Sequence, residues 1–183
     1  MFKMRRIFLI LLICSLCVGC DQFTKVQATK YLSDQPTMSF LWDTFRLQYS
    51  LNTGAMLSLG ANLSDGVRAL IFTYGVGLFL IILAIYTIFK QHPPLTTIAL
   101  SLFLGGGIGN LIDRYFQGYV VDFLNVGIGW LRTGIFNVAD MAVMLGFGIL
   151  IFTQFSEGDA SEDEAEDEEP QEPDAPEEAL TSA

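Results

Sequence analysis

The sequence predicts a membrane protein that is mainly α-helical, with four transmembrane helices, a small extracytoplasmic β-sheet and a disordered acidic C-terminal tail. Three observations lead to this fold class. The chain of 183 residues is 51% hydrophobic and holds 15 Phe. Several of its apolar runs are long enough to cross a bilayer. Its acidic residues are unevenly distributed, because 13 of the 20 lie in residues 156–183, which hold no Lys or Arg.

The apolar runs predict four membrane spans, at about residues 7–28, 68–89, 95–114 and 134–155. Residues 69–89 and 93–112 carry no charge over 21 and 20 positions. The first apolar run covers only residues 7–19, so it spans the membrane only if its helix continues through CDQFTKVQATKYL. Helices are the expected form because backbone groups in lipid must hydrogen-bond within their own segment.

The basic residues give the expected orientation. Lys3, Arg5 and Arg6 precede the first span, which places the N-terminus in the cytoplasm by the positive-inside rule. Four spans then return the C-terminus to the cytoplasm, with Lys90 on the same side. Six cations fall outside and count against this orientation: Lys25, Lys30, Arg46, Arg68, Arg114 and Arg132. We keep the orientation because the first span usually determines the topology of the whole chain, and because several outer cations lie beside aspartates.

The chain divides into a membrane domain, residues 1–155, and an acidic tail, residues 156–183. Within the domain, residues 45–52 alternate between apolar and polar side chains, which predicts a half-buried strand after a turn near Asp43. We expect an outer β region at about residues 38–58 and a second outer loop at residues 115–132. The tail is rich in Glu, Asp, Pro and Ala and poor in hydrophobic residues, so we expect it to be disordered.

Cysteine and histidine usage excludes several chemistries. The three cysteines lie three residues apart in the first span, where small packing residues are the expected role. The single His92 lies in KQHPP on the expected cytoplasmic turn, away from other polar clusters, so Ser–His–Asp catalysis and a His-based zinc site are disfavoured. GGGIGN at 105–110 lacks the context of a nucleotide loop, and we expect its glycines to permit close helix packing. We expect neither a metal nor a cofactor.

The polar residues of the spans fall into short sets spaced three or four residues apart, which share a helix face. The sets are Asp21 with Lys25, Asn110 with Asp113 and the adjacent Arg114, and Asn137 with Asp140. If the first and third helices run outward, all sets reach the outer end of the bundle. Asp122 lies at the same level, in the loop between the third and fourth helices. The polar sets therefore converge on one side of the membrane.

Asp122 and Asp140 differ from the other aspartates of the sets because no cation is adjacent to them in the sequence. Two carboxylates that meet without a cation cannot both ionise easily, so one keeps a proton. The ionised member can then take a proton from water while the protonated member polarises a carbonyl, which hydrolyses a peptide bond. The alternative role is structural: the polar sets hold the helices together. This alternative suits Asp21 and Asp113, which have neighbouring cations.

Five blocks of residues follow one another along the chain. They are DQFTK at 21–25, NTGAMLS at 52–58, GGGIGNLIDR at 105–114, VVDF at 120–123 and FNVAD at 136–140. In content, order and placement they resemble the bacterial lipoprotein signal peptidase family, signal peptidase II, over roughly residues 5–155. The resemblance implies a membrane aspartic endopeptidase that removes signal peptides from prolipoproteins just before a diacylglyceryl-modified Cys.

The resemblance assigns Asp122 and Asp140 as the catalytic dyad. Asp113 matches a family position as well, but its neighbour Arg114 favours an ion pair and a structural role for it. Seven further residues match positions that shape or support the site: Asp21, Lys25, Asn52, Gly54, Asn110, Arg114 and Asn137. It also implies a multi-pass protein of the bacterial cytoplasmic (inner) membrane, with its active site near the outer face. The expected partners are prolipoproteins and membrane lipids, without nucleic acid, and we expect a monomer. The outer sheet around Asn52 is expected to cover the site.

Two other functions stay open on the sequence alone. An ion or proton transporter also carries aspartates in membrane helices. Four spans without repeats or broken-helix pairs suit transport poorly, however, and these acids gather near one surface. The N-terminal segment also resembles a lipoprotein signal that ends at Cys20, so the chain could instead be lipid-anchored there. Cys17 stands where such signals favour Leu, and three further spans follow, which favours a first membrane helix.

Overall fold

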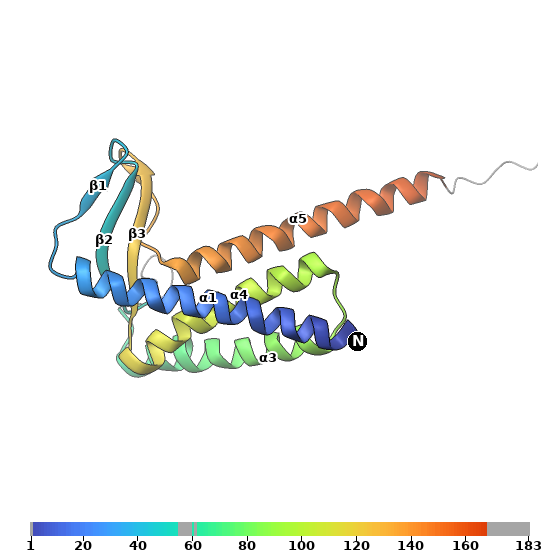
Figure 1. Cartoon of the computed structure of the whole chain (residues 1–183), viewed down its shortest axis with the longest axis horizontal. Coiled ribbons are helices and arrows are strands. Elements are labelled where there is room, and N and C mark those ends of the chain that lie inside the picture. The colour runs from blue at the N-terminus through green and yellow to red at the C-terminus, as the bar shows by residue number, and fades with distance from the viewer. Residues whose placement is uncertain (1, 55–59, 61, 168–183) are drawn as a thin grey trace, which may run out of the picture.

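The computed structural model describes residues 2–54, 60 and 62–167. Four of its helices are long and apolar enough to cross a membrane, which confirms the predicted mainly helical membrane fold (Figure 1). These spans are Lys3–Leu32, Asp65–Phe89, Pro94–Gln117 and Val138–Phe155. The KQHPP segment forms the short connection between the second and third spans, as expected.

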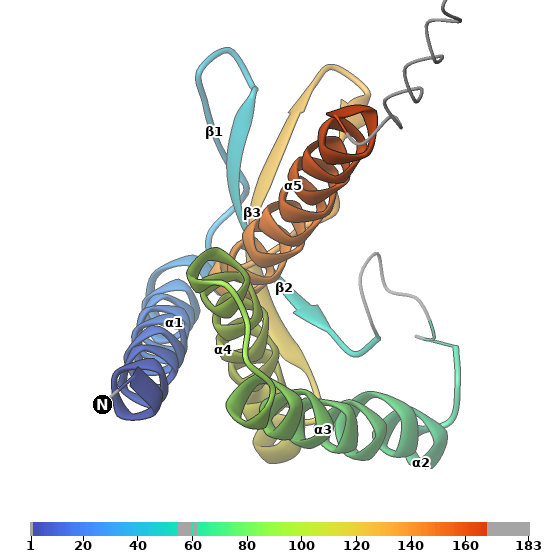
Figure 2. The same ribbon diagram turned by 90° about the vertical axis from the view of Figure 1, so that its right-hand side faces the viewer.

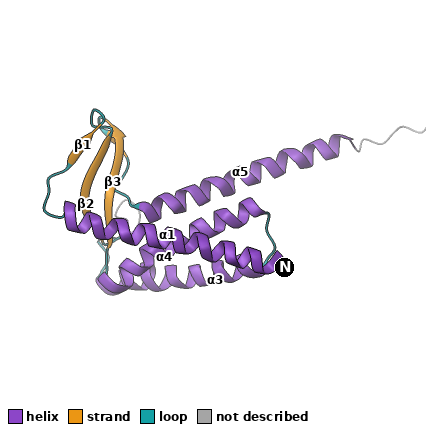
Figure 3. Cartoon of the chain, viewed as in Figure 1, coloured by secondary structure: helices purple, strands orange, loops and turns teal. Residues whose placement is uncertain are grey.

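The helices run up and down between two ends of the bundle. α1 (Phe2–Leu32) leads to the strands β1 (Met38–Phe40) and β2 (Phe45–Asn52), and a continuous helical stretch follows, composed of α2 (Asp65–Arg68), η2 (Ala69–Gly75) and α3 (Val76–Phe89). α4 (Pro94–Gln117) returns to the strands β3 (Val120–Ile128) and β4 (Leu131–Arg132), and α5 (Val138–Asp167) leads away from them. We call the end that carries the strands the sheet end and the other, at the α3–α4 connection, the turn end (Figure 3).

Local sequence signals set the bounds of α4. Pro94 occupies its first turn, where the missing N–H is not needed and the fixed φ suits a helix. At the other end Gly118 adopts a left-handed conformation with φ of 77°, and its N–H donates to the carbonyl of Arg114 at 3.1 Å. This glycine cap ends the helix two residues before β3 begins.

Three consecutive glycines let α4 approach three other helices. A Cβ on Gly105 would lie 2.7 Å from Cys17 Cβ of α1, and one on Gly106 would lie 2.3 Å from the carbonyl oxygen of Ala139 of α5. A Cβ on Gly107 would lie 2.6 Å from Leu80 of α3. The sequence prediction that these glycines serve close packing is confirmed, and α4 is the central helix of the bundle.

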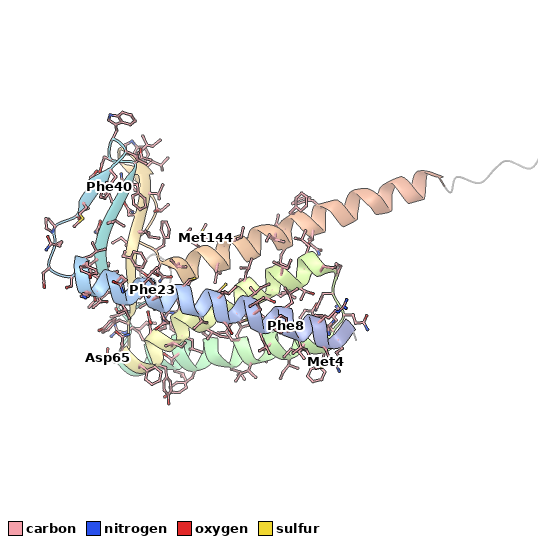
Figure 4. The ribbon with its side chains drawn as sticks, viewed as in Figure 1. Met4, Phe8, Phe23, Phe40, Asp65 and Met144 are labelled. Carbon is pink, nitrogen blue, oxygen red and sulfur yellow. The ribbon has the colours of Figure 1, made fainter. Side chains whose placement is uncertain are left out.

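The outer faces of the helices are covered with exposed large apolar side chains. Phe8 and Phe23 on α1 and Met144 on α5 are examples, and Figure 4 labels all three along the outside of the bundle. Exposed apolar surface on this scale would be unfavourable in water, whereas lipid acyl chains solvate it. The exposed apolar faces therefore agree with four helices that span a bilayer.

The four strands form one antiparallel sheet in the order β1–β2–β3–β4. β2 is the strand predicted at residues 45–52, although an extra residue between Leu47 and Ser50 shifts its register against β3. This bulge interrupts the expected alternation, and Leu51 is exposed rather than buried. A small core of Ala28, Val121 and Phe123 packs the sheet against the end of α1.

Two boundaries differ from the sequence expectation. Residues 115–132 are not a loop, because they contain β3 and β4, and Asp122 lies on β3. β3 is buried on both faces over Val120–Phe123, so its sequence lacks the alternation that marks a half-buried strand. α5 extends to Asp167, past the expected start of the tail, because residues 138–169 contain no proline. Residues 168–183 lie outside the described residues.

The close approach of α4 and α5 predicts that Gly106→Ala lowers the melting temperature. The new methyl group would push against the backbone of Ala139 and the side chain of Val143. Such overpacking costs about 1–3 kcal/mol, or several degrees in Tm. The matched control is Gly148→Ala on α5, whose Cβ would meet nothing within 4 Å. Thermal unfolding in detergent measures both variants, and equal Tm values would contradict this packing.

Candidate active site

The sheet crosses the ends of the helices (Figures 1 and 3). Polar side chains from five elements meet there. The contacts given below bring together all nine residues expected at the site. They are Asp21 and Lys25 on α1, Asn52 on β2, Gly54 after it, Asn110 and Arg114 on α4, Asp122 on β3, Asn137 before α5 and Asp140 in its first turn. Asp21, Asp113, Asp122 and Asn137 are at most 2% exposed.

Asn137 and Asp140 cap the N-terminus of α5 reciprocally. The backbone N–H of Asp140 donates to Oδ1 of Asn137 at 3.0 Å, and the backbone N–H of Asn137 donates to Oδ2 of Asp140 at 3.1 Å. This is the capping-box arrangement, with Asn and Asp in place of the usual Ser/Thr and Glu. The cap therefore fixes the Asp140 carboxyl group at the N-terminus of α5.

Asn137 links the two aspartates through its side chain and its backbone. Its Nδ2 donates to Oδ1 of Asp122 at 2.7 Å, while its backbone N–H donates to Asp140. Oδ2 of Asp122 accepts a second hydrogen bond from Nδ2 of Asn52 at 3.0 Å. Asn52 is itself held by a local turn, because its Oδ1 accepts from the backbone N–H of Gly54 at 3.0 Å. One amide on each side thus fixes the Asp122 carboxyl group.

Burial changes the acid strength of Asp122. Its side chain has almost no contact with solvent, and desolvation is the main cause that raises its pKa from 3.8 to about 6. The hydrogen bond from Asn52 opposes this shift, whereas the nearby charge of Asp140 adds to it. Asp122 therefore keeps its proton to a higher pH than an ordinary aspartate.

Lys25 fixes the orientation of the Asn110 amide. Oδ1 of Asn110 accepts from Nζ of Lys25 at 2.9 Å and from Nδ2 of Asn137 at 3.1 Å. The amide nitrogen of Asn110 therefore points the other way, and it donates to Oδ1 of Asp140 at 2.8 Å. Lys25 is buried and forms no ion pair with Asp122 or Asp140. Through its hydrogen bond to Asn110 it determines that the amide nitrogen of Asn110, and not the oxygen, faces Asp140.

Lys25 also forms the centre of a buried ion triad. Its Nζ lies 2.8 Å from Oδ2 of Asp21 and 2.9 Å from Oδ2 of Asp113. Oδ1 of Asp21 accepts the backbone N–H of Ala139, in the first turn of α5, at 2.9 Å. Oδ2 of Asp113 accepts the backbone N–H of Val121, the residue before Asp122, at 3.3 Å. The triad thus joins α1 and α4 to the segments that carry both Asp122 and Asp140.

Two features of this cluster differ from the sequence interpretation. Asp113 pairs with Lys25 of α1 rather than with its sequence neighbour Arg114. Gln22 was not singled out, yet its Nε2 donates to Oδ1 of Asp113 at 2.9 Å and to the carbonyl of Gly109 at 3.2 Å. Its position directly after Asp21, as an uncharged polar residue in a membrane helix, was the available signal.

Arg114 connects the site to the segment after β2. Its Nη2 donates to the carbonyl of Gly54 at 2.9 Å, and its Nε is buried without a hydrogen-bond partner among the described residues. A cavity of about 250 Å³ lies beside it, and Thr53 and Phe72 also line this cavity. The guanidinium lies within electrostatic range of both Asp122 and Asp140. The block residues 55–58 fall within the segment 55–59, which lies outside the described residues.

The arrangement provides two adjacent carboxyl groups with different environments. Asp140 accepts two N–H donors at a helix N-terminus, and Asp122 is buried with a raised pKa. Such a pair can act as base and acid toward water and a carbonyl group. In the described part of the chain, no three His, Cys, Asp or Glu side chains are grouped as a metal ion requires. His92 lies in the α3–α4 connection at the turn end, whereas both carboxyl groups lie at the sheet end.

Known proteins are similar to this chain over most of its length. The family model described as Signal peptidase (SPase) II matches residues 13–156. A lipoprotein signal peptidase of Brevibacillus brevis is 35% identical over 147 residues, which cover 80% of this chain and 95% of that protein. One of Syntrophotalea carbinolica is 37% identical over 159 residues, which cover 85% of this chain and 96% of that protein.

Solved structures give the same result for the fold. A structure titled as a bacterial membrane enzyme solved by the in meso method at 2.3 Å resolution superimposes with a TM-score of 0.71 at 25% identity. The match covers 89% of this chain and 93% of that chain. A second structure of the same description, at 1.9 Å resolution, matches with a TM-score of 0.68 at 27% identity. The chain is a multi-pass bacterial membrane protein, and it belongs to the signal peptidase II family of lipoprotein signal peptidases.

Proposed function

We propose that this chain is an aspartic endopeptidase that hydrolyses the peptide bond before the diacylglyceryl-modified Cys of prolipoproteins, with Asp122 and Asp140 as its catalytic residues. The family gives the class of reaction and the class of substrate. The single observation that carries the aspartic mechanism is the Asn137 bridge, because this one residue donates a hydrogen bond to each of the two carboxyl groups.

The two aspartates take different roles because their surroundings differ. Asp140 accepts hydrogen bonds from Asn110 and from the backbone of Asn137 at the start of α5, and we assign it as the base. Asp122 has a pKa raised to about 6 by burial, so it is the acid that retains the proton. The nearby negative charge of Asp140 favours the protonated form of Asp122.

The hydrolysis then proceeds in two steps. Asp140 takes a proton from water as the water oxygen attacks the scissile carbonyl carbon, and Asp122 donates its proton to the carbonyl oxygen. In the second step the resulting diol returns a proton to Asp122, and Asp140 gives its proton to the leaving amide nitrogen as the C–N bond breaks. The products are a carboxylic acid and the free amino group of the Cys, and both aspartates return to their starting states.

The bundle geometry suits a substrate that lies in the membrane. The four basic residues Lys3, Arg5, Arg6 and Lys90 lie at the turn end, which supports a cytoplasmic location for both termini. The sheet end, with both aspartates, then lies at the outer face. The buried Nε of Arg114 is a donor available to a backbone carbonyl of the substrate. β2 lies beside β3 in the sheet and its Asn52 contacts Asp122, which supports a role for this strand in excluding bulk water.

Replacement of either aspartate tests the mechanism. We expect Asp122→Asn and Asp140→Asn each to lower kcat for a diacylglyceryl-modified prolipoprotein by about 10³-fold or more, because each removes an acid–base group. The matched control, Asp34→Asn, changes an exposed carboxylate between α1 and β1 and keeps full activity. Retained binding of uncleaved substrate by the Asn variants separates loss of chemistry from loss of folding. Normal cleavage by either folded variant would overturn the dyad assignment.

The pH dependence tests which aspartate carries the proton. If Asp122 is the acid, kcat/KM falls as the pH rises through about 6, the raised pKa of that carboxyl group. The hydrogen bond from Asn52 favours the ionised form, so Asn52→Ala raises the pKa of Asp122 further and moves this fall to higher pH. Gln48→Ala on the same strand is the control and leaves the profile in place. A profile that moves to lower pH in Asn52→Ala would assign the proton elsewhere.

A further inference from the structure

Two neighbouring turns of the sheet carry a group of exposed large apolar side chains. One turn connects β1 to β2 and the other connects β3 to β4. We call this group the aromatic tip, and it consists of Phe40, Leu41, Trp42, Ile128, Trp130 and Leu131. Trp42 and Trp130 are 99% and 93% exposed, so nothing in the described part of the chain covers either indole. These two are the only tryptophans in the sequence.

Hydrogen bonds hold the two turns together as one unit. The backbone N–H of Gly127 donates to the carbonyl of Thr44 at 2.9 Å, and Nη1 of Arg132 donates to the carbonyl of Asp43 at 2.6 Å. The Asp43 carboxylate also accepts from Ser39 and Arg46, and these partners hold its pKa well below its usual range. The charged groups next to the aromatic tip thus form one cluster, in which Asp43 pairs with both Arg46 and Arg132.

The first turn has an uncommon backbone. Leu41, Trp42 and Asp43 have φ values of 52°, 51° and 68°, in the left-handed region that glycine occupies most readily. This backbone conformation is unfavourable for residues other than glycine. The exposure of Leu41 and Trp42 to water is a second unfavourable feature. An apolar phase that takes up Leu41 and Trp42 would account for their exposure.

The position of the aromatic tip indicates which phase this is. Viewed along the helices, the ends of the two hairpins extend beyond α1, α3 and α4 (Figure 2). In the side view the sheet stands at the end of the bundle where α5 begins (Figure 1). Because four helices cross the membrane, the region next to the bundle at this level is the boundary between lipid and water. Tryptophan prefers this boundary.

We propose that the aromatic tip inserts into the interfacial region of the lipid leaflet at the sheet end of the bundle. β3 begins near Asp122 and ends at the tip, six residues later at Ile128, which is about 20 Å along a strand. The inserted tip is a second point of attachment for the sheet, besides its packing on α1. It fixes the tilt of β3, and therefore the depth of Asp122 relative to the lipid surface. This proposal depends on the four spans and not on the proposed reaction.

The two native tryptophans report on the tip without any added probe. The protein is reconstituted into bilayers of phosphatidylcholine whose acyl chains are brominated close to the glycerol, and its emission is compared with that in unbrominated lipid. Insertion predicts blue-shifted emission that the brominated lipid strongly quenches and that aqueous acrylamide quenches weakly. The single variants Trp42→Phe and Trp130→Phe assign the signal to each turn, and both turns are expected to be quenched by bromine.

Two reference variants calibrate the result in a background that lacks both native tryptophans. Phe8→Trp places the indole on the lipid-facing side of α1, and Asp34→Trp places it on the exposed connection to β1. A tip in the interface behaves like the Phe8→Trp reference, and a tip that behaves like Asp34→Trp overturns the proposal. Blue-shifted emission without bromine quenching, and dependent on the protein-to-lipid ratio, would assign the tip to contact with a second copy of the chain and would also overturn it.

Discussion

The candidate site depends on one buried cation. Lys25 of α1 lies between Asp21 and Asp113, and these two carboxylates accept backbone N–H groups from the start of α5 and from β3. No contact in this set is local to one element of the fold, apart from the helical pair Asp21–Lys25. A buried charge is stable only when its partners are in place, so the triad requires α1, α4, β3 and α5 to assemble in one arrangement.

Amide side chains connect the triad to Asp122 and Asp140. Lys25 fixes the Asn110 amide, and Asn110 and Asn137 then direct their N–H donors at Asp140 and Asp122. Neutral amide groups donate directly to both carboxyl groups, whereas the nearby cations Lys25 and Arg114 form no ion pair with either of them among the described residues. The site can therefore keep one acid protonated while the neighbouring helix N-terminus stabilises charge on the other.

The sequence predicted the helices better than the sheet, for physical reasons. Long uncharged runs have one stable form in lipid, and the i, i+3 and i, i+4 spacing of the polar sets places them on one helix face. β3 was missed because a strand buried on both faces reads as a plain apolar run. The pairing of Asp113 with Arg114 was wrong because adjacent helix residues do not face each other, and only the fold brings Lys25 to Asp113.

The thermal stability of a Lys25→Met variant tests the central role of the triad most directly. Removal of one partner of a buried ion pair costs about 3–5 kcal/mol, because two aspartates are left without their cation. For a chain of this size that loss lowers Tm by roughly 6–20 °C, whereas Lys30→Met, at an exposed position on the same helix, leaves Tm nearly unchanged. Equal Tm values for the two variants would contradict the account and would make the triad a consequence of the fold, not a condition for it.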